Sequence, residues 1–113
     1  MFARLMGLRS ISPSDLHQTM LQQPTVIVDV NSRQSWINAR VPGALNLDPF
    51  GYSPADLPGD SKSRIVFYCS NPLCRKAPNA ALRAKKMGYS DVMVMSAGIT
   101  GWTAMNLPTE SGE

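Results

Sequence analysis

The sequence contains little of the material from which disulfide frameworks and metal sites are built. It has only two cysteines and one histidine, whereas small secreted scaffolds spread more cysteines along the chain. A zinc site needs four ligands, and His17 lies far in sequence from Cys69 and Cys74. We therefore expect neither a disulfide framework nor a bound metal.

Long apolar runs are also missing. No stretch approaches the roughly 20 residues with which a helix crosses a membrane. Arg4 and Arg9 interrupt the mildly apolar start, and no continuous apolar stretch leads to a small-residue cleavage site. We therefore expect a cytoplasmic protein with no signal peptide and no membrane contact.

Length and composition indicate one globular domain. A chain of 113 residues, 43% hydrophobic and 17% charged, can build a single core. We expect the domain to span residues 11–108 and to act as a monomer. Residues 1–10 are interpreted as an N-terminal arm that docks or frays, and residues 109–113 as a flexible C-terminal tail.

The net charge of +3 is modest, but its distribution is uneven. Between Ser61 and Ser90 the chain carries no acid and the following basic residues: Lys62, Arg64, Arg75, Lys76, Arg83, Lys85 and Lys86. Positive potential around a thiol favours the thiolate and attracts anions. The alternative is a solvated basic helix face. Nucleic acid is not an expected partner, because aromatic residues do not interleave with these charges.

Alternating strand and helix signals predict the fold class. Strands are predicted over 25–30, 44–47, 64–69 and 91–95. Helices are predicted between Ser12 and Pro24 and over 32–38, 76–87 and 99–105. The segment 48–63 is rich in Pro, Gly, Ser and Asp and is predicted to be a long surface loop. Apolar strands that alternate with helices indicate a layered α/β fold with parallel pairing.

Cys69 is the first candidate for chemistry. Ligands of parallel α/β sheets bind beyond the carboxyl ends of the strands, and Cys69 ends a predicted strand that a helix follows. Amides of the loop and of the helix N-terminus would cradle an anion there and favour the thiolate. Arg75 and Lys76 at the helix start are unfavourable by roughly 0.3–1 kcal/mol against the helix dipole, and a bound anion would offset that cost. The alternative is a helix that starts later.

The spacing from Cys69 to Arg75 supports a second interpretation. Cysteine-dependent phosphatases hold phosphate with loop amides and an arginine at this Cys-x5-Arg spacing. Here Tyr68 precedes the cysteine and Lys76 follows the arginine, where those enzymes have histidine and serine or threonine. A phosphatase or arsenate-type enzyme is therefore the alternative to be tested.

Six segments in order, from about Ile11 to Pro108, resemble the rhodanese family. They are ISPSDL at 11–16, VIVDV at 26–30, VPGALN at 41–46, VFYC at 66–69, Ala80-Ala81 with GYSDV at 88–92, and GITGW at 98–102. The resemblance implies a three-layer α/β fold whose central sheet is mainly parallel, with helices on both faces. Asn31 stands where the family has arginine, Arg40 where it has histidine, and the loop after Cys69 is one or two residues longer.

The resemblance also implies a sulfurtransferase. Cys69 would attack the outer sulfur of thiosulfate or a similar anionic donor and carry it as a persulfide. The loop that would hold donor and persulfide consists of Ser70, Asn71, Pro72, Leu73, Cys74 and Arg75. Asp29 and Lys76 are expected to support the site, Asp29 by organising the sheet end. A thiol, cyanide or a protein acceptor would remove the sulfur, and the scheme needs no metal or organic cofactor.

Two questions stay open. Cys74 is either a resolving thiol, which accepts sulfur from Cys69 or closes a disulfide with it, or a small side chain tucked under the helix. Disulfide closure requires Cα atoms within about 7 Å. A non-catalytic rhodanese-like binding module is the third functional class. The presence of Cys69 argues against that class, because inactive members resemble the family with this cysteine lost.

Overall fold

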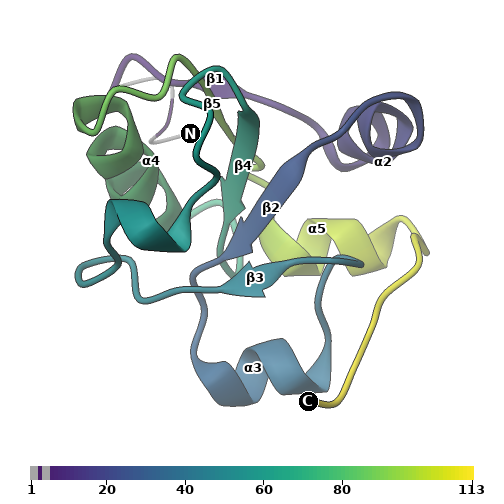
Figure 1. The fold of residues 1–113 in the computed structure, drawn as a ribbon. Coiled ribbons are helices and arrows are strands. Elements are labelled where there is room, and N and C mark those ends of the chain that lie inside the picture. The colour runs from purple at the N-terminus through teal and green to yellow at the C-terminus, as the bar shows by residue number, and fades with distance from the viewer. Residues whose placement is uncertain (1–2, 4–5) are drawn as a thin grey trace.

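The computed structural model describes residue 3 and residues 6–113. One sheet has the strand order β1-β5-β4-β2-β3, all its pairings are parallel, and helices cover both faces (Figure 1). The strands are β1 (Arg9–Ser10), β2 (Val26–Asp29), β3 (Leu45–Asn46), β4 (Arg64–Tyr68) and β5 (Asp91–Val94). The helices are α2 (Pro13–Gln22), α3 (Arg33–Asn38), α4 (Lys76–Lys86) and α5 (Gly98–Ala104), with the 3-10 turn η1 (Pro54–Asp56). The predicted three-layer α/β fold is confirmed.

Side chains of the central strand alternate between two cores. Ile65 and Phe67 of β4 belong to the core that contains the α4 alanines Ala77, Ala80, Ala81 and Ala84. Val66 and Tyr68 point to the opposite core. Leu16 of α2 and Trp102 of α5 are fully buried in that second core. Both faces of the strand are therefore buried, as its unbroken apolar run predicts.

Helix α2 starts at the predicted cap. The Ser12 Oγ accepts a hydrogen bond from the Asp15 amide at 3.1 Å, and Pro13 fits the first turn because it has no N–H to leave without a partner.

Across the part of the chain that the structure describes, no helix has the length and apolar character needed to cross a membrane.

The chain enters the sheet earlier than the sequence analysis places the domain. In β1, Arg9 lies beside Met93 and Ser10 beside Val94 of β5, and Leu8 is buried. The structure thus places Arg9 and Ser10 in the domain and not in an arm. A two-residue strand held by backbone pairing leaves no periodicity in the sequence. Residues 1–2 and 4–5 of the predicted arm lie outside the described residues.

The segment 48–63 is partly buried, which corrects the prediction of a surface loop. Tyr52 and Leu57 are 3% and 8% exposed. The Tyr52 hydroxyl donates to the Ala80 carbonyl of α4 at 2.6 Å, and Arg83 donates back to the Tyr52 carbonyl at 3.0 Å. Composition predicts the irregular backbone correctly, but two apolar side chains hold the segment against α4.

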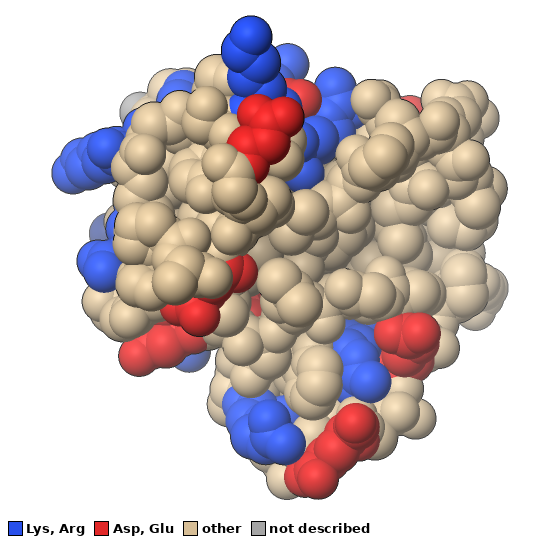
Figure 2. Space-filling model, viewed as in Figure 1, with Lys and Arg blue, Asp and Glu red and all other residues tan. Residues whose placement is uncertain are grey.

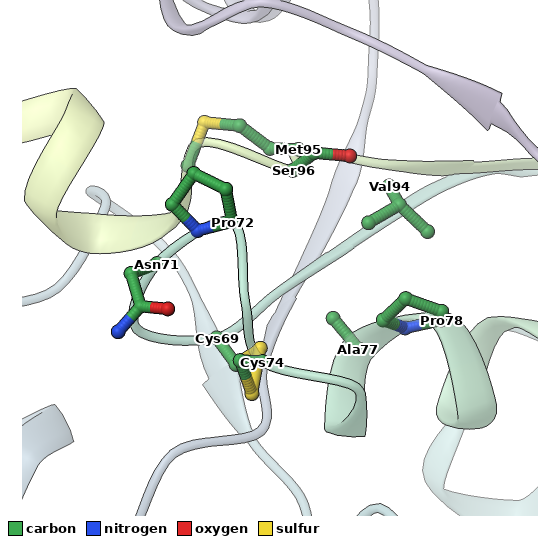
Figure 3. A pocket seen from close by; sticks show the side chains of 9 residues that line it. All are labelled: Cys69, Asn71, Pro72, Cys74, Ala77, Pro78, Val94, Met95 and Ser96. Atoms are coloured by element: carbon green, nitrogen blue, oxygen red, sulfur yellow. A yellow bond between two sulfur atoms is a disulfide. The ribbon is translucent and has the colours of Figure 1, made fainter. Parts of the chain in front are cut away.

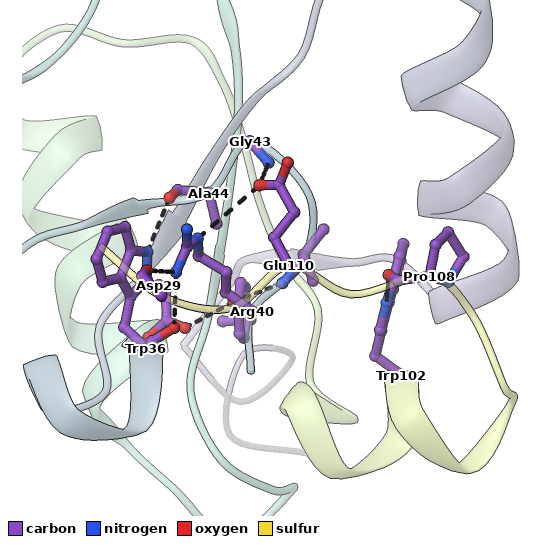
Figure 4. Close-up of polar contacts among 11 residues, drawn as sticks. Asp29, Trp36, Arg40, Gly43, Ala44, Trp102, Pro108 and Glu110 are labelled. Atoms are coloured by element: carbon purple, nitrogen blue, oxygen red, sulfur yellow. Dashed lines mark hydrogen bonds and ion pairs between the residues drawn. The ribbon is translucent and has the colours of Figure 1, made fainter. Parts of the chain in front are cut away.

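The C-terminal tail lies against the segment that follows α3 (Figure 4). Arg40 and Glu110 exchange backbone hydrogen bonds of 2.9 Å, and the Gly112 amide donates to the Ile37 carbonyl at 2.8 Å. The Arg40 side chain donates to the Gly112 carbonyl at 2.7 Å and lies 3.9 Å from the centre of the Trp36 ring. The sequence analysis expects a flexible tail, whereas these contacts attach it to the domain.

Candidate active site

Cys69 directly follows β4 at the carboxyl end of the sheet. It is 2% exposed and belongs to the core that α4 covers. Cys69 lines a small cavity together with Ala77 and Pro78 from the first turn of α4. The cysteine therefore lies between a strand end and a helix start, where the sequence predicts it.

Cys69 and Cys74 form a disulfide (Figure 3). Their Cα atoms are 6.4 Å apart, within the range that such a bond spans without backbone movement. Of the two interpretations left open for Cys74, the structure shows the one in which it closes a disulfide with Cys69.

The loop between the cysteines is folded on itself. The Asn71 side-chain oxygen accepts a hydrogen bond from the Leu73 amide at 2.9 Å, and the Asn71 carbonyl accepts one from the Cys74 amide at 3.1 Å. In this disulfide form the amides of Leu73 and Cys74 are used inside the loop. They are not directed at an anion, which differs from the cradle that the sequence analysis expects from the whole loop.

The cavity beside the disulfide is small. Its volume is about 10 Å³, which corresponds to about one water molecule. Asn71 and Pro72 from the loop and Met95 and Ser96 after β5 complete its wall (Figure 3). The disulfide form therefore has no room for thiosulfate next to the Cys69 sulfur.

Two cations stand at the start of α4. Arg75 is the N-cap residue and Lys76 the first residue of the helix. Both residues are exposed, and Arg75 makes no capping hydrogen bond to the helix with its side chain. Positive charge together with the helix N-terminus favours an anion here.

The rest of the basic stretch lies elsewhere. Arg64 is paired with Asp91 at 3.0 Å, while Lys85 and Lys86 are in the last turn of α4. On the face shown in Figure 2, blue side chains lie on the α4 side, at the top and around α3, and the α2 side is largely uncharged. The basic residues that are grouped in the sequence are thus separated in the structure, and of those between Ser61 and Ser90 it is Arg75 and Lys76 that directly follow Cys74.

The start of α5 supports the loop from behind. The Ile99 amide donates to the Cys69 carbonyl at 2.9 Å, and the Thr100 amide donates to the Ser70 carbonyl at 3.1 Å. Gly98 has a φ of +68°, and a Cβ at this position would lie 2.5 Å from the Ser70 carbonyl atoms. Only glycine fits both the backbone angle and this close approach.

A buried polar network fixes the ends of the neighbouring strands. Asp29 is fully buried and accepts hydrogen bonds from the Tyr68 hydroxyl at 2.6 Å and the Asn31 amide at 2.8 Å. The Tyr68 hydroxyl in turn accepts from the Val41 amide at 3.1 Å. Desolvation raises the pKa of Asp29, although its hydrogen bonds oppose the shift. Through these hydrogen bonds Asp29 joins the end of β2 to the end of β4 and to the residues that follow β2.

Asn31 connects this network to the loop. Its side-chain oxygen accepts a hydrogen bond from the Ser70 hydroxyl at 2.7 Å, and its carbonyl accepts one from Asn46 at 2.9 Å. The residue that departs from the family pattern at this position thus holds the first residue after Cys69.

A larger cleft opens beside the loop. Its volume is about 260 Å³, enough for a small molecule. It is lined by the segment from the end of β2 to the start of α3, by the end of β3 with the residues after it, and by the first residue of α4: Val30, Asn31, Ser32, Arg33, Asn46, Leu47, Asp48, Pro49 and Lys76. Of the residues that the sequence analysis assigns to the site, only Lys76 lies here.

Three contributors to the site were missed in the sequence. Gly98 and the Tyr68 hydroxyl act through contacts between distant segments, which no local pattern reveals. Asn31 was noted only as a departure from the family.

Among the described residues, no group of three or more His, Cys, Asp or Glu side chains could hold a metal ion.

The structure thus has a parallel α/β sheet with a cysteine directly after its central strand β4 and a helix N-terminus beyond it. The family model of the rhodanese-like domain matches residues 12–105. The chain therefore belongs to the rhodanese-like domain family.

Individual relatives are distant. The chain is 27% identical over 96 residues to the uncharacterized protein YibN of Escherichia coli K12, covering 81% of this chain and 65% of YibN. It is 24% identical over 106 residues to the thiosulfate sulfurtransferase GlpE of Haemophilus influenzae PittEE, covering 94% of this chain and 98% of GlpE. The crystal structure of a thiosulfate sulfurtransferase from Pseudomonas aeruginosa superposes with a TM-score of 0.79 at 24% identity, covering 94% of this chain and 20% of that one. This likeness supports the fold.

Proposed function

We propose that the protein is a thiosulfate sulfurtransferase in which Cys69 carries the sulfur. The observation that carries the proposal is the position of Cys69, at the end of β4 and against the first turn of α4, where Arg75 and Lys76 add positive charge. Membership of the rhodanese-like family and the similarity to GlpE, which is named a thiosulfate sulfurtransferase, support it.

The reaction has two steps. The Cys69 thiolate attacks the outer sulfur of thiosulfate, the sulfur–sulfur bond of the donor breaks, and sulfite leaves with the electron pair. A persulfide remains on Cys69. A thiolate or cyanide then attacks the outer sulfur of the persulfide, and the Cys69 thiolate is released. Arg75 and Lys76 attract the dianionic donor and the negative charge of the leaving sulfite.

The reduced form is the active form in this scheme. The disulfide ties up the Cys69 sulfur, and its cavity of about 10 Å³ excludes the donor. Reduction frees the loop to open and releases both thiols. We therefore propose that the protein works in a reducing compartment such as the cytoplasm.

The test is the intact mass of the reduced protein after incubation with thiosulfate. The Cys69→Ser and Cys74→Ser variants form a matched pair, since each keeps one cysteine of the disulfide. We expect Cys74→Ser to gain one sulfur atom and Cys69→Ser to gain none. The wild type should carry the same sulfur atom until it is displaced by Cys74 or passed to an acceptor. Sulfur on Cys69→Ser would contradict the assignment of the nucleophile.

A second pair of variants tests the cations. Lys76→Ala removes charge at the start of α4, and Lys86→Ala removes it at the far end of the same helix. We expect Lys76→Ala to raise the KM for thiosulfate several-fold, with a larger effect at low salt. Lys86→Ala should leave the KM unchanged, and equal effects of the two variants would refute a local role.

If the reduced protein takes up no sulfur from thiosulfate, the two alternative functions, a phosphatase-type enzyme and a non-catalytic binding module, are favoured. Hydrolysis of an aryl phosphate that depends on Cys69 and Arg75 would indicate a phosphatase-type enzyme. A protein inactive in both assays would be a rhodanese-like binding module.

A further inference from the structure

We propose that Cys74 resolves the Cys69 persulfide and releases hydrogen sulfide, so that the protein also acts as a dithiol-dependent thiosulfate reductase. This inference rests on the proposed function, because it needs sulfur to be carried on Cys69. It adds an activity: the sulfur leaves as sulfide without an external acceptor.

The loop brings the two sulfurs together. Both hydrogen bonds accepted by Asn71 fold the loop so that the Cys74 Cα lies 6.4 Å from that of Cys69. Ile99 and Thr100 hold the carbonyls of Cys69 and Ser70. The loop is thus held by α5 at its Cys69 end and folded onto itself at its Cys74 end, which keeps the two cysteines close together.

Burial favours the neighbouring cysteine over an external acceptor. Cys69 is 2% exposed. Once sulfite has left, closure of the loop toward the arrangement of the disulfide form narrows the cavity next to Cys69 to about 10 Å³, which hinders the approach of an acceptor from solvent. Cys74 is part of the cavity wall and attacks from within the chain. Intramolecular attack in a favourable geometry corresponds to very high effective concentrations, on the order of 10⁵ M or more in the best cases.

The charges at this place suit a thiolate nucleophile. Cys74 is followed by Arg75 and Lys76 and by the N-terminus of α4, and these positive charges stabilise an anionic sulfur. Leu73 on its other side is 71% exposed and carries no charge. Arg75 and Lys76, which attract the anionic donor, thus also stabilise the thiolate of Cys74.

The atoms and electrons of the step balance. The Cys74 thiolate attacks the Sγ atom of the Cys69 persulfide, the bond between Sγ and the outer sulfur breaks, and hydrosulfide leaves and takes up a proton from water. The outer sulfur is reduced to sulfide while the two cysteine sulfurs are oxidised to the disulfide that the structure shows. A dithiol reductant then exchanges with this disulfide and restores both thiols. The sum converts thiosulfate and a dithiol into sulfite, hydrogen sulfide and a disulfide.

A single-turnover experiment separates this inference from the proposed function. Reduced protein, freed of reductant, receives thiosulfate without an acceptor, and sulfite, sulfide and intact mass are followed with time. A dithiol must be left out, because it would itself remove the persulfide sulfur. The wild type is compared with Cys74→Ser, and sulfite release by Cys74→Ser shows that the variant is folded and binds sulfur.

We expect the wild type to release sulfite and sulfide in equal amounts and to end as the disulfide, lighter than the reduced protein by two hydrogens. Cys74→Ser should release sulfite alone and keep the extra sulfur, with a persulfide lifetime at least about tenfold longer. A wild-type persulfide as stable as that of Cys74→Ser, without sulfide, would overturn the inference and leave the sulfurtransferase intact. No sulfite from either protein would remove both.

Discussion

Replacing Gly98 by alanine should disturb the loop between Cys69 and Cys74 and also destabilise the fold. A Cβ there would lie 2.5 Å from the Ser70 carbonyl atoms and 2.6 Å from the Asn71 amide nitrogen. These are backbone atoms, which cannot rotate away as a flexible side chain can. The φ of +68° costs an L-residue about 1–2 kcal/mol, and crowding of this kind costs about 1–3 kcal/mol. We therefore expect Gly98→Ala to lower the free energy of unfolding by about 2–5 kcal/mol.

Gly43 provides the matched control. Its φ is +80°, and among the described atoms a Cβ there would meet nothing within 4 Å. Gly43→Ala should therefore cost only the conformational term of about 1–2 kcal/mol. Urea unfolding of the reduced proteins measures both costs. Gly98→Ala should also bind sulfur more slowly, because Ile99 and Thr100 hold the carbonyls of Cys69 and Ser70. Equal costs in the two variants would refute the close approach.

Three further predictions concern the buried polar groups. Tyr68→Phe removes one hydrogen bond from Asp29 and one from the Val41 amide. Urea unfolding should therefore show that the free energy of unfolding falls by about 1–3 kcal/mol. A decrease smaller than the error of that measurement would contradict this. The pKa of Asp29 is raised from 3.8, so the stability that its neutral form adds is present below that value and lost as pH rises through the raised pKa. The free energy of unfolding of the wild type, compared with that of Asp29→Asn, should accordingly decrease with rising pH; a constant difference would oppose the assignment. Arg40→Ala, whose side chain is 11% exposed, should cost about 1–3 kcal/mol, whereas Arg33→Ala, 64% exposed, should cost about 0.5 kcal/mol or less.

The sequence predicts those parts of the fold that depend on local pattern. The apolar runs of β2, β4 and β5 carry the signal of strands buried on both faces, and the alanine spacing of α4 marks the face that packs on them. The tail was missed because its partner Arg40 is distant in sequence. Tyr52 was assigned to a surface loop because composition does not show that its hydroxyl reaches α4.

The candidate site likewise has parts that a local sequence pattern predicts and parts that depend on contacts between distant segments. The position of Cys69 could be predicted because a strand end before a helix is visible in one chain segment. Closure with Cys74 was one of two open possibilities, since sequence spacing does not fix how a loop curls. The orientation of the loop depends on Gly98 and on the Ser70–Asn31 hydrogen bond. Both involve segments tens of residues apart, so no local pattern could indicate them.

The two outermost strands of the sheet are also its shortest. β1 and β3 have two residues each, while the longer β4 is enclosed between β5 and β2. Long edge strands offer rows of backbone donors and acceptors on which another chain can pair and aggregate. Here such a row is limited to two residues at either edge of the sheet. The sheet can thus keep an apolar centre below Cys69 while offering little template for edge-to-edge aggregation.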